Sequence, residues 1–255
     1  MLRVFLLLVV LLMVSLTTWQ ERYLSTRWRE PLFVAIYPIA ADDSPKTSAY
    51  TATLDSESFK PIDRFFARQA EEFHLGTAEP IRTRLRGLLQ DRPPERAADA
   101  GVFSTALWSL RLRYWAWRVS GNAHEPEDIR IFVLYHDPDI TPTVPHSLGL
   151  TKGLIGVVYA FATPLMNEEN DVVIAHELLH TLGATDKYDL ATDAPLFPVG
   201  YGDPGQNPLY PQRNAELMAG RRMLAPDHWE QAASLDQVVV GPATALEIRW
   251  TDHVR

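Results

Sequence analysis

The 255-residue chain contains no cysteine, which excludes a disulfide framework and leaves the fold to depend on its hydrophobic core. It also lacks an excess of positive charge. The formal net charge of −8 argues against nucleic-acid binding as its main task. Because 46% of the residues are hydrophobic, the chain can bury a substantial core, and we expect one globular domain over residues 23–255.

The first 22 residues differ in composition from the rest of the chain. Residues 4–20 carry no charge and would span roughly 25 Å as a helix, close to the lower limit for crossing a bilayer. We expect residues 1–22 to be a membrane anchor or a signal segment. An uncleaved anchor is favoured because no small-x-small cleavage site follows. Arg3 ahead of the apolar run predicts an exported protein anchored in the inner membrane and facing the periplasm or cell exterior. Secretion after signal cleavage is the alternative.

Hydrophobic periodicity predicts alternating strands and helices in the first two thirds of the domain. Residues 41–58 and 91–99 are expected to be loops. Together the pattern predicts an α/β fold in which a sheet carries the helix over residues 168–182 across one face. The expected strands are residues 32–37, 81–86, 129–135 and one or two within 147–161; the expected helices begin at Pro61 and cover 102–119 and 168–182.

A metal-binding pattern follows within the last of these helices. His176 and His180 are four residues apart, so both imidazoles lie on one helix face and can reach one zinc ion. Glu177 is rotated by about 100° from His176, as a general base beside the metal requires. Gly183 is expected to end the helix in a left-handed conformation and return Asp186 toward the histidines as third ligand. The alternatives are structural histidines and an aspartate that only forms a turn.

Residues 176–186, HELLHTLGATD, resemble the extended metzincin motif HExxHxxGxxH/D, in the variant whose third ligand is aspartate, as in snapalysin-like peptidases. Residues 215–220, AELMAG, resemble the Met-turn of that clan, although Met218 could also be an ordinary core residue. The resemblance implies a metzincin-like mixed sheet with a zinc-binding active-site helix, a Met-turn and a C-terminal helix. The helix at 102–119 is then an insertion.

The resemblance also implies a Zn²⁺-dependent metalloendopeptidase with Glu177 as general base. Tyr188 could stabilise an oxyanion near the metal or could merely cover the loop. The substrate would be a peptide or protein segment bound in extended form along a sheet edge within residues 147–158. Two other functions stay open: a membrane-tethered metal-binding scaffold without turnover, against which the intact Glu177 argues, and a zinc amidase acting on cell-wall amide bonds.

The segment after the metal motif is rich in proline and glycine and is expected to be irregular as far as the Met-turn. We expect this segment to line the primed side of the substrate-binding cleft. Its aspartates could bind calcium, but without EF-hand spacing solvated loop carboxylates are favoured; these are Asp186, Asp189, Asp193 and Asp203. Residues 226–235 are expected to form the C-terminal helix, and residues 244–250 a last short strand or an extended tail.

Overall fold

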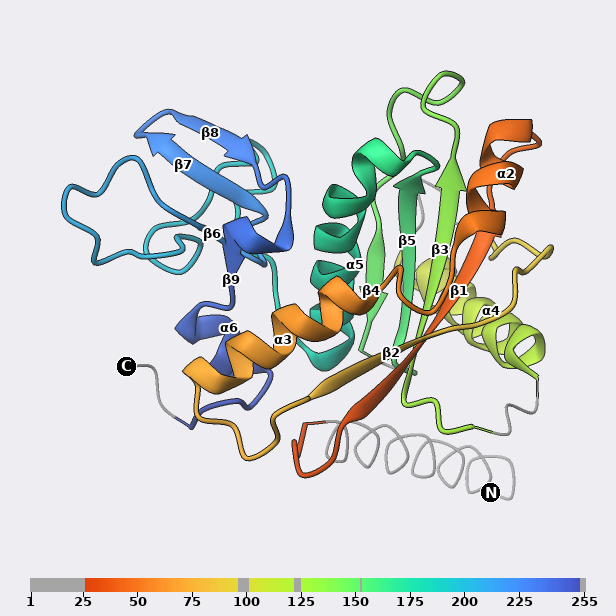
Figure 1. Ribbon diagram of the computed structural model, residues 1–255, viewed down its shortest axis with the longest axis horizontal. Helices are drawn as coiled ribbons and strands as arrows, with labels where there is room; N and C mark the ends of the chain where they lie inside the picture. The colour runs from red at the N-terminus through yellow and green to blue at the C-terminus, as the bar shows by residue number, and fades with distance from the viewer. Residues whose placement is uncertain (1–25, 96–100, 122–124, 152, 253–255) are drawn as a thin grey trace.

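Five strands form the central sheet of the protein, in the order β2-β1-β3-β5-β4 (Figure 1). The computed structural model describes residues 26–95, 101–121, 125–151 and 153–252. The first four strands in this order are mutually parallel, and only β4 is antiparallel to its neighbour. The expected α/β class with a mixed sheet is therefore confirmed. The strands are β1 (Leu32–Ala40), β2 (Ile81–Leu85), β3 (Ile129–His136), β4 (Leu148–Leu150) and β5 (Ile155–Phe161).

Both faces of the sheet are covered, which explains why β1 and β3 are almost continuously apolar. Side chains alternate between the faces along each strand. Val34 and Ile36 belong to one hydrophobic cluster, whereas Ala35 and Tyr37 belong to another on the opposite face. The sheet therefore separates two cores.

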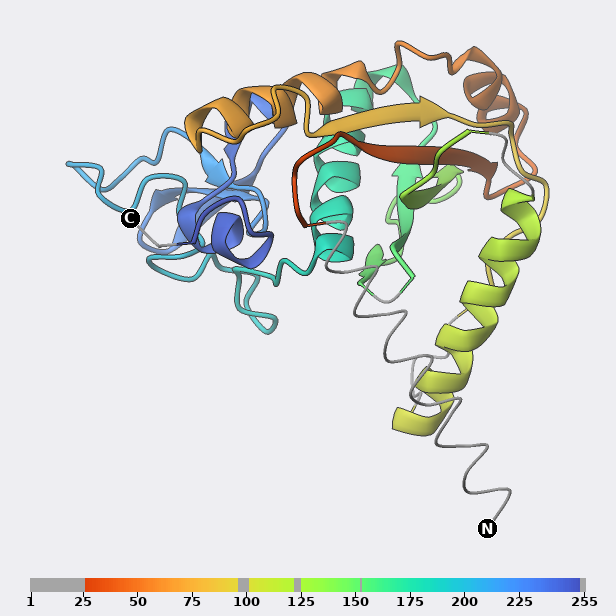
Figure 2. The same ribbon diagram turned by 90° about the horizontal axis from the view of Figure 1, so that it is seen from below.

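Helices α2 (Pro45–Thr53), α3 (Lys60–Glu72) and α5 (Asn167–Leu182) contribute to the first core, and α4 (Val102–Ser120) packs against the second. Figure 2 shows α4 on the far side of the sheet from α5. The helices expected from Pro61, over 102–119 and over 168–182 are confirmed within one or two residues. The two strands β4 and β5 account for residues 147–161.

The prediction of a loop over residues 41–58 was wrong, because α2 lies within it. Ser44 caps this helix by accepting a hydrogen bond from the Lys46 N–H, and Pro45 occupies the first turn. Few apolar residues mark the helix, since it buries mainly Tyr50, whose ring lies 5.0 Å from that of Tyr135. For residues 91–95, the described part of the second expected loop, no helix or strand is present.

The C-terminal part of the chain also differs from expectation. Residues 226–235 do not form a helix. Pro226 and Asp227 instead form the turn of a hairpin in which Met223 pairs with Trp229. Residues 244–250 are likewise not a strand or extended tail, because Gly241 and Pro242 start a short helix there. The elements are β6 (Ala215–Glu216), β7 (Arg221–Ala225), β8 (His228–Gln231), β9 (Val238–Val239), α6 (Pro242–Glu247) and the 3₁₀ turns η1 (Pro164–Met166) and η2 (Leu235–Gln237).

The anchor or signal segment expected at residues 1–22 lies outside the described residues. Among the helices that are described, none is both long enough and apolar enough to cross a membrane.

Candidate metal centre

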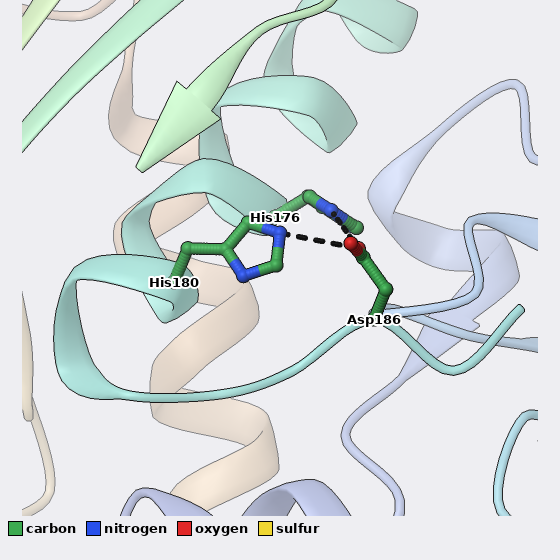
Figure 3. Close-up of side chains that lie close together, drawn as sticks. All are labelled: His176, His180 and Asp186. Carbon is green, nitrogen blue, oxygen red and sulfur yellow. Dashed lines mark ion pairs between the residues drawn. The ribbon is translucent and has the colours of Figure 1, made fainter. Parts of the chain in front are cut away.

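Helix α5 presents the two histidines of the motif on one face, with their ring centroids 4.6 Å apart. The helix ends where the sequence predicts. Gly183 adopts a left-handed conformation with φ of 102°, and its N–H donates to the carbonyl of His180 at 3.1 Å. The chain reverses at this point, so the segment after the helix runs back past the histidines (Figure 3).

Asp186 lies between the two imidazoles as a result. Its Oδ1 atom is 3.2 Å from the Nε2 atom of His176 and 3.2 Å from that of His180 (Figure 3). The opposite ring nitrogens face backbone carbonyls. His176 Nδ1 lies 3.0 Å from the Leu217 oxygen, and His180 Nδ1 lies 2.8 Å from the Ala184 oxygen. Each Nδ1 therefore donates its proton, which leaves both Nε2 lone pairs directed at Asp186.

These distances fit a tetrahedral metal site. Zinc–nitrogen and zinc–oxygen bonds of about 2.0–2.1 Å place neighbouring ligand atoms about 3.3 Å apart at tetrahedral angles. The two Nε2–Oδ1 separations of 3.2 Å match this edge length. Asp186 Oδ1 is also buried and has no hydrogen-bond partner among the described residues. The group of His176, His180 and Asp186 could thus hold a metal ion.

Charge interactions within the group oppose the effect of burial. Burial alone would raise the pKa of the Asp186 carboxyl, but its close contacts with the His176 and His180 rings hold that pKa well below its ordinary value. For His180, burial lowers the pKa, but the contact with Asp186 outweighs it, so the pKa is raised. The carboxylate is therefore ionised and available as a ligand across the neutral range.

Glu177 lies beside this group without belonging to it. It is 5% exposed, and its Oε2 atom is buried without a hydrogen-bond partner among the described residues. Burial raises the pKa of the Glu177 carboxyl. A buried carboxylate with a free oxygen at the edge of a cleft is suited to accept a proton from a molecule bound there.

Residues 215–220 form a turn that contacts His176 through a backbone carbonyl. Met218 is fully buried, and the carbonyl that orients His176 belongs to the preceding Leu217. The turn is held by Glu216, which is itself fully buried. Its carboxylate accepts four hydrogen bonds, from the N–H groups of Met218 (2.5 Å), Ala219 (3.1 Å) and Gly241 (3.1 Å) and from the Thr244 hydroxyl (2.6 Å). An acceptor with four donors fixes the turn against α6.

The loop with the third ligand is tied to the same turn. The Lys187 N–H donates to the Met218 carbonyl at 3.0 Å. The buried Lys187 ammonium donates to the Thr185 carbonyl at 2.9 Å and to Glu247 of α6 at 2.7 Å. Asp186 is thus flanked on both sides by residues with fixed partners, which restricts where its carboxylate can lie.

The group opens into a cleft of about 540 Å³ that also contains Glu177, Tyr188, His146 and Arg221. The Arg221 guanidinium lies 5.0 Å from the Tyr188 ring centroid and 3.3 Å from the Asp193 carboxylate. The short edge strand β4 lies against α5 at the side of the cleft, and a side chain at Gly149 would collide with His180. The expected substrate edge is therefore next to the metal ligands.

The structure brings the three predicted ligands together and places Glu177 and Tyr188 in the same cleft. Two other aspartates of the loop bond locally: the Asp189 carboxylate accepts three hydrogen bonds within residues 189–192, and the Asp203 carboxylate accepts one from the Gly205 N–H. The third, Asp193, pairs with Arg221 of β7. Sequence reasoning missed the supporting residues Glu216, Lys187 and Arg221. The local sequence gives no signal of the contacts that join these residues to distant segments, which are those of Glu216 with Gly241 and Thr244, of Lys187 with Glu247 and of Arg221 with Asp193.

Comparison with protein-family models and with curated proteins produced no match for this chain. The geometry of the site therefore supplies the argument for function.

Proposed function

We propose that the protein is a zinc metalloendopeptidase of metzincin type, in the variant with an aspartate as third ligand. The observation that carries the proposal is the convergence of both histidine Nε2 atoms on one Asp186 oxygen, beside a buried Glu177 oxygen without a partner. A purely structural zinc has four closed protein ligands. Among the described residues only three ligands converge here, which favours an open, catalytic position.

A bound zinc and three parts of the chain, Glu177, Tyr188 and β4, would act around the scissile bond. A bound zinc would act as a Lewis acid toward water and the peptide carbonyl. Glu177 would take the proton of the attacking water and return it to the departing amine. The Tyr188 hydroxyl, in the same cleft, would donate to the carbonyl oxygen as negative charge develops on it. Residues of β4 would pair with an extended substrate.

The substrate is proposed to be a peptide or protein segment outside the cytoplasm. The apolar residues 4–20 and Arg3 support an exported protein that is anchored to the inner membrane by its N-terminal segment. A simply secreted form, after cleavage of that segment, is the alternative.

The test is Glu177→Gln, which keeps the shape of the side chain and removes the base. In the full-length protein we expect zinc content and thermal stability close to those of the parent, with hydrolysis of a diverse peptide library lowered at least about a hundredfold. Glu169→Gln, the same change in the first turn of α5, is the matched control and should leave hydrolysis unchanged.

Three other outcomes would each contradict part of the proposal. A parent that binds zinc but cleaves neither peptides nor cell-wall fragments would support the scaffold function instead. Cleavage of cell-wall amide bonds alone would support the amidase. An active parent with an equally active Glu177→Gln variant would place the chemistry outside this cleft.

A further inference from the structure

Helix α4 exposes a continuous apolar stripe on the side turned away from the sheet. Its residues follow one another at alternating intervals of four and three, and each is between 42% and 85% exposed. The rings of Tyr114 and Trp117 lie 5.9 Å apart within it. We call this set the α4 stripe: Phe103, Leu107, Leu110, Tyr114 and Trp117.

The stripe is not needed to attach the helix to the domain. The opposite face of α4 packs on the second core through Trp108, Leu112, Trp115 and Ala116, all of which are buried. A helix that is apolar all round is normally covered on every side. An exposed row of five large apolar side chains on one helix is the signature of an interaction surface.

The charged residues that α4 itself carries beside the stripe are all arginines. At about 100° per residue, Arg111 and Arg118 lie roughly 60–80° from the stripe's centre on one side, and Arg113 lies roughly 80° away on the other. The helix contains no acidic residue, although the whole chain has a net charge of −8. Arg118 contacts Asp91 at 2.7 Å, whereas Arg111 forms no ion pair with any described residue. The intervals of the stripe would suit a two-helix seam, but a second copy would bring arginines against arginines.

We propose that the α4 stripe is a docking surface for an anionic lipid bilayer, with the helix lying along the headgroup region. Aromatic side chains favour the boundary between headgroups and acyl chains, and the stripe contains three: Phe103, Tyr114 and Trp117. Flanking arginines attract anionic headgroups and can extend from the edge of a buried apolar face. A lipid surface with anionic headgroups thus complements both the apolar row and its cationic borders.

This orientation would separate the proposed metal centre from the bilayer. Because α4 and α5 lie on opposite faces of the sheet (Figure 2), a bilayer against α4 would lie across the sheet from the helix that carries His176 and His180. The protein would then act on substrates in the aqueous phase and not on lipid or on membrane-embedded segments.

The test uses single nitroxide labels on the full-length protein in vesicles. Since the chain has no cysteine, Leu110→Cys and Leu165→Cys each give one labelling site. Leu165 lies in η1 and is 93% exposed, so it serves as the matched control away from α4. Power-saturation EPR then compares collisions with oxygen, which concentrates in lipid, and with a nickel chelate, which stays in water. Vesicles contain phosphatidylcholine alone or with about 30% phosphatidylglycerol.

We expect the label at residue 110 to gain oxygen collisions and lose nickel collisions in the anionic vesicles, while the label at residue 165 stays in water. Adding Arg111→Gln and Arg118→Gln should reduce the change at residue 110. A label at residue 110 that stays in water in both vesicles would overturn the proposal. A label shielded from both reagents would overturn it in favour of protein packing, by a second copy or by residues 4–20. An equal change in both vesicles would refute the role of anionic headgroups. None of these results depends on whether the cleft hydrolyses peptides.

Discussion

Replacing Glu216 by glutamine should destabilise the protein and weaken its metal binding at the same time. One oxygen of this carboxylate accepts from Met218 and Ala219, and the other accepts from Gly241 and Thr244. Glutamine keeps one oxygen and turns the other into an NH₂ group. In the less costly orientation the NH₂ group faces Gly241 and Thr244; the Thr244 hydroxyl can then turn and accept from it, but the Gly241 N–H loses its acceptor.

The magnitude follows from that count. A buried donor left without an acceptor costs about 1–3 kcal/mol, so the loss at Gly241 should lower the free energy of unfolding by about that amount. The carbonyl that holds His176 Nδ1 belongs to Leu217, inside the same turn. Displacing such a partner typically weakens metal affinity about 10–100-fold. Thr244→Val removes a single donor and leaves three, so it should cost only about 1 kcal/mol.

Urea denaturation and zinc titration against a chromogenic chelator measure the two effects. Glu230→Gln is the matched control, because the same change there affects only a surface pair with Arg222 and should shift the unfolding free energy by less than about 1 kcal/mol. If Glu216→Gln is too unstable to purify, Thr244→Val still tests the direction. A Glu216→Gln protein that unfolds and binds zinc like the Glu230→Gln control would refute the supporting role of this carboxylate.

Three further predictions concern individual charges. Asp186→Ala should weaken zinc binding by more than about a hundredfold, and Tyr188→Phe should leave it almost unchanged in the same titration, because only the first change removes a ligand. Burial, helped by Glu168, raises the pKa of Asp171 to about 7, so the folded protein keeps this proton while the unfolded chain loses it near pH 4. The parent should lose stability between about pH 4 and 7, and Asp171→Asn should be more stable than the parent by about 2–4 kcal/mol at pH 8 but not at pH 4 in urea denaturation. Lys187→Met should lower the unfolding free energy by about 1–3 kcal/mol, because it leaves Glu247 without its buried partner; unchanged urea midpoints would contradict this.

The sequence predicted the central sheet well because its strands are buried on both faces. Continuous apolar runs such as those of β1 and β3 are unambiguous when turn residues bound them. Helix α2 was missed because it buries little more than Tyr50, and its start signal, Ser44 before Pro45, is also common in loops. A helix was expected over residues 226–235, where the structure has the turn and second strand of the β7–β8 hairpin, because the pairing of Met223 with Trp229 leaves no mark in the local periodicity.

The candidate site, too, could be predicted only in part. His176, Glu177, His180 and Asp186 could be predicted because one helix and its glycine cap position them within eleven residues. Their supporting contacts could not be. Glu216 receives hydrogen bonds from residues up to 28 positions away, and Lys187 contacts Glu247 at a separation of 60. Local patterns do not contain such pairings.

These long-range contacts make the positions of the three proposed metal ligands depend on the C-terminal part of the chain. His176 is oriented through Leu217, and Asp186 is flanked by Lys187, whose backbone and ammonium contact the same turn and α6. Helix α6 has only six residues and could not persist alone in water. Its contacts to the buried Glu216 and Lys187 stabilise it, and it in turn fixes both ligand-bearing segments. The metal site, the turn below it and α6 should therefore form and open as one cooperative unit, distinct from the sheet that α5 packs against.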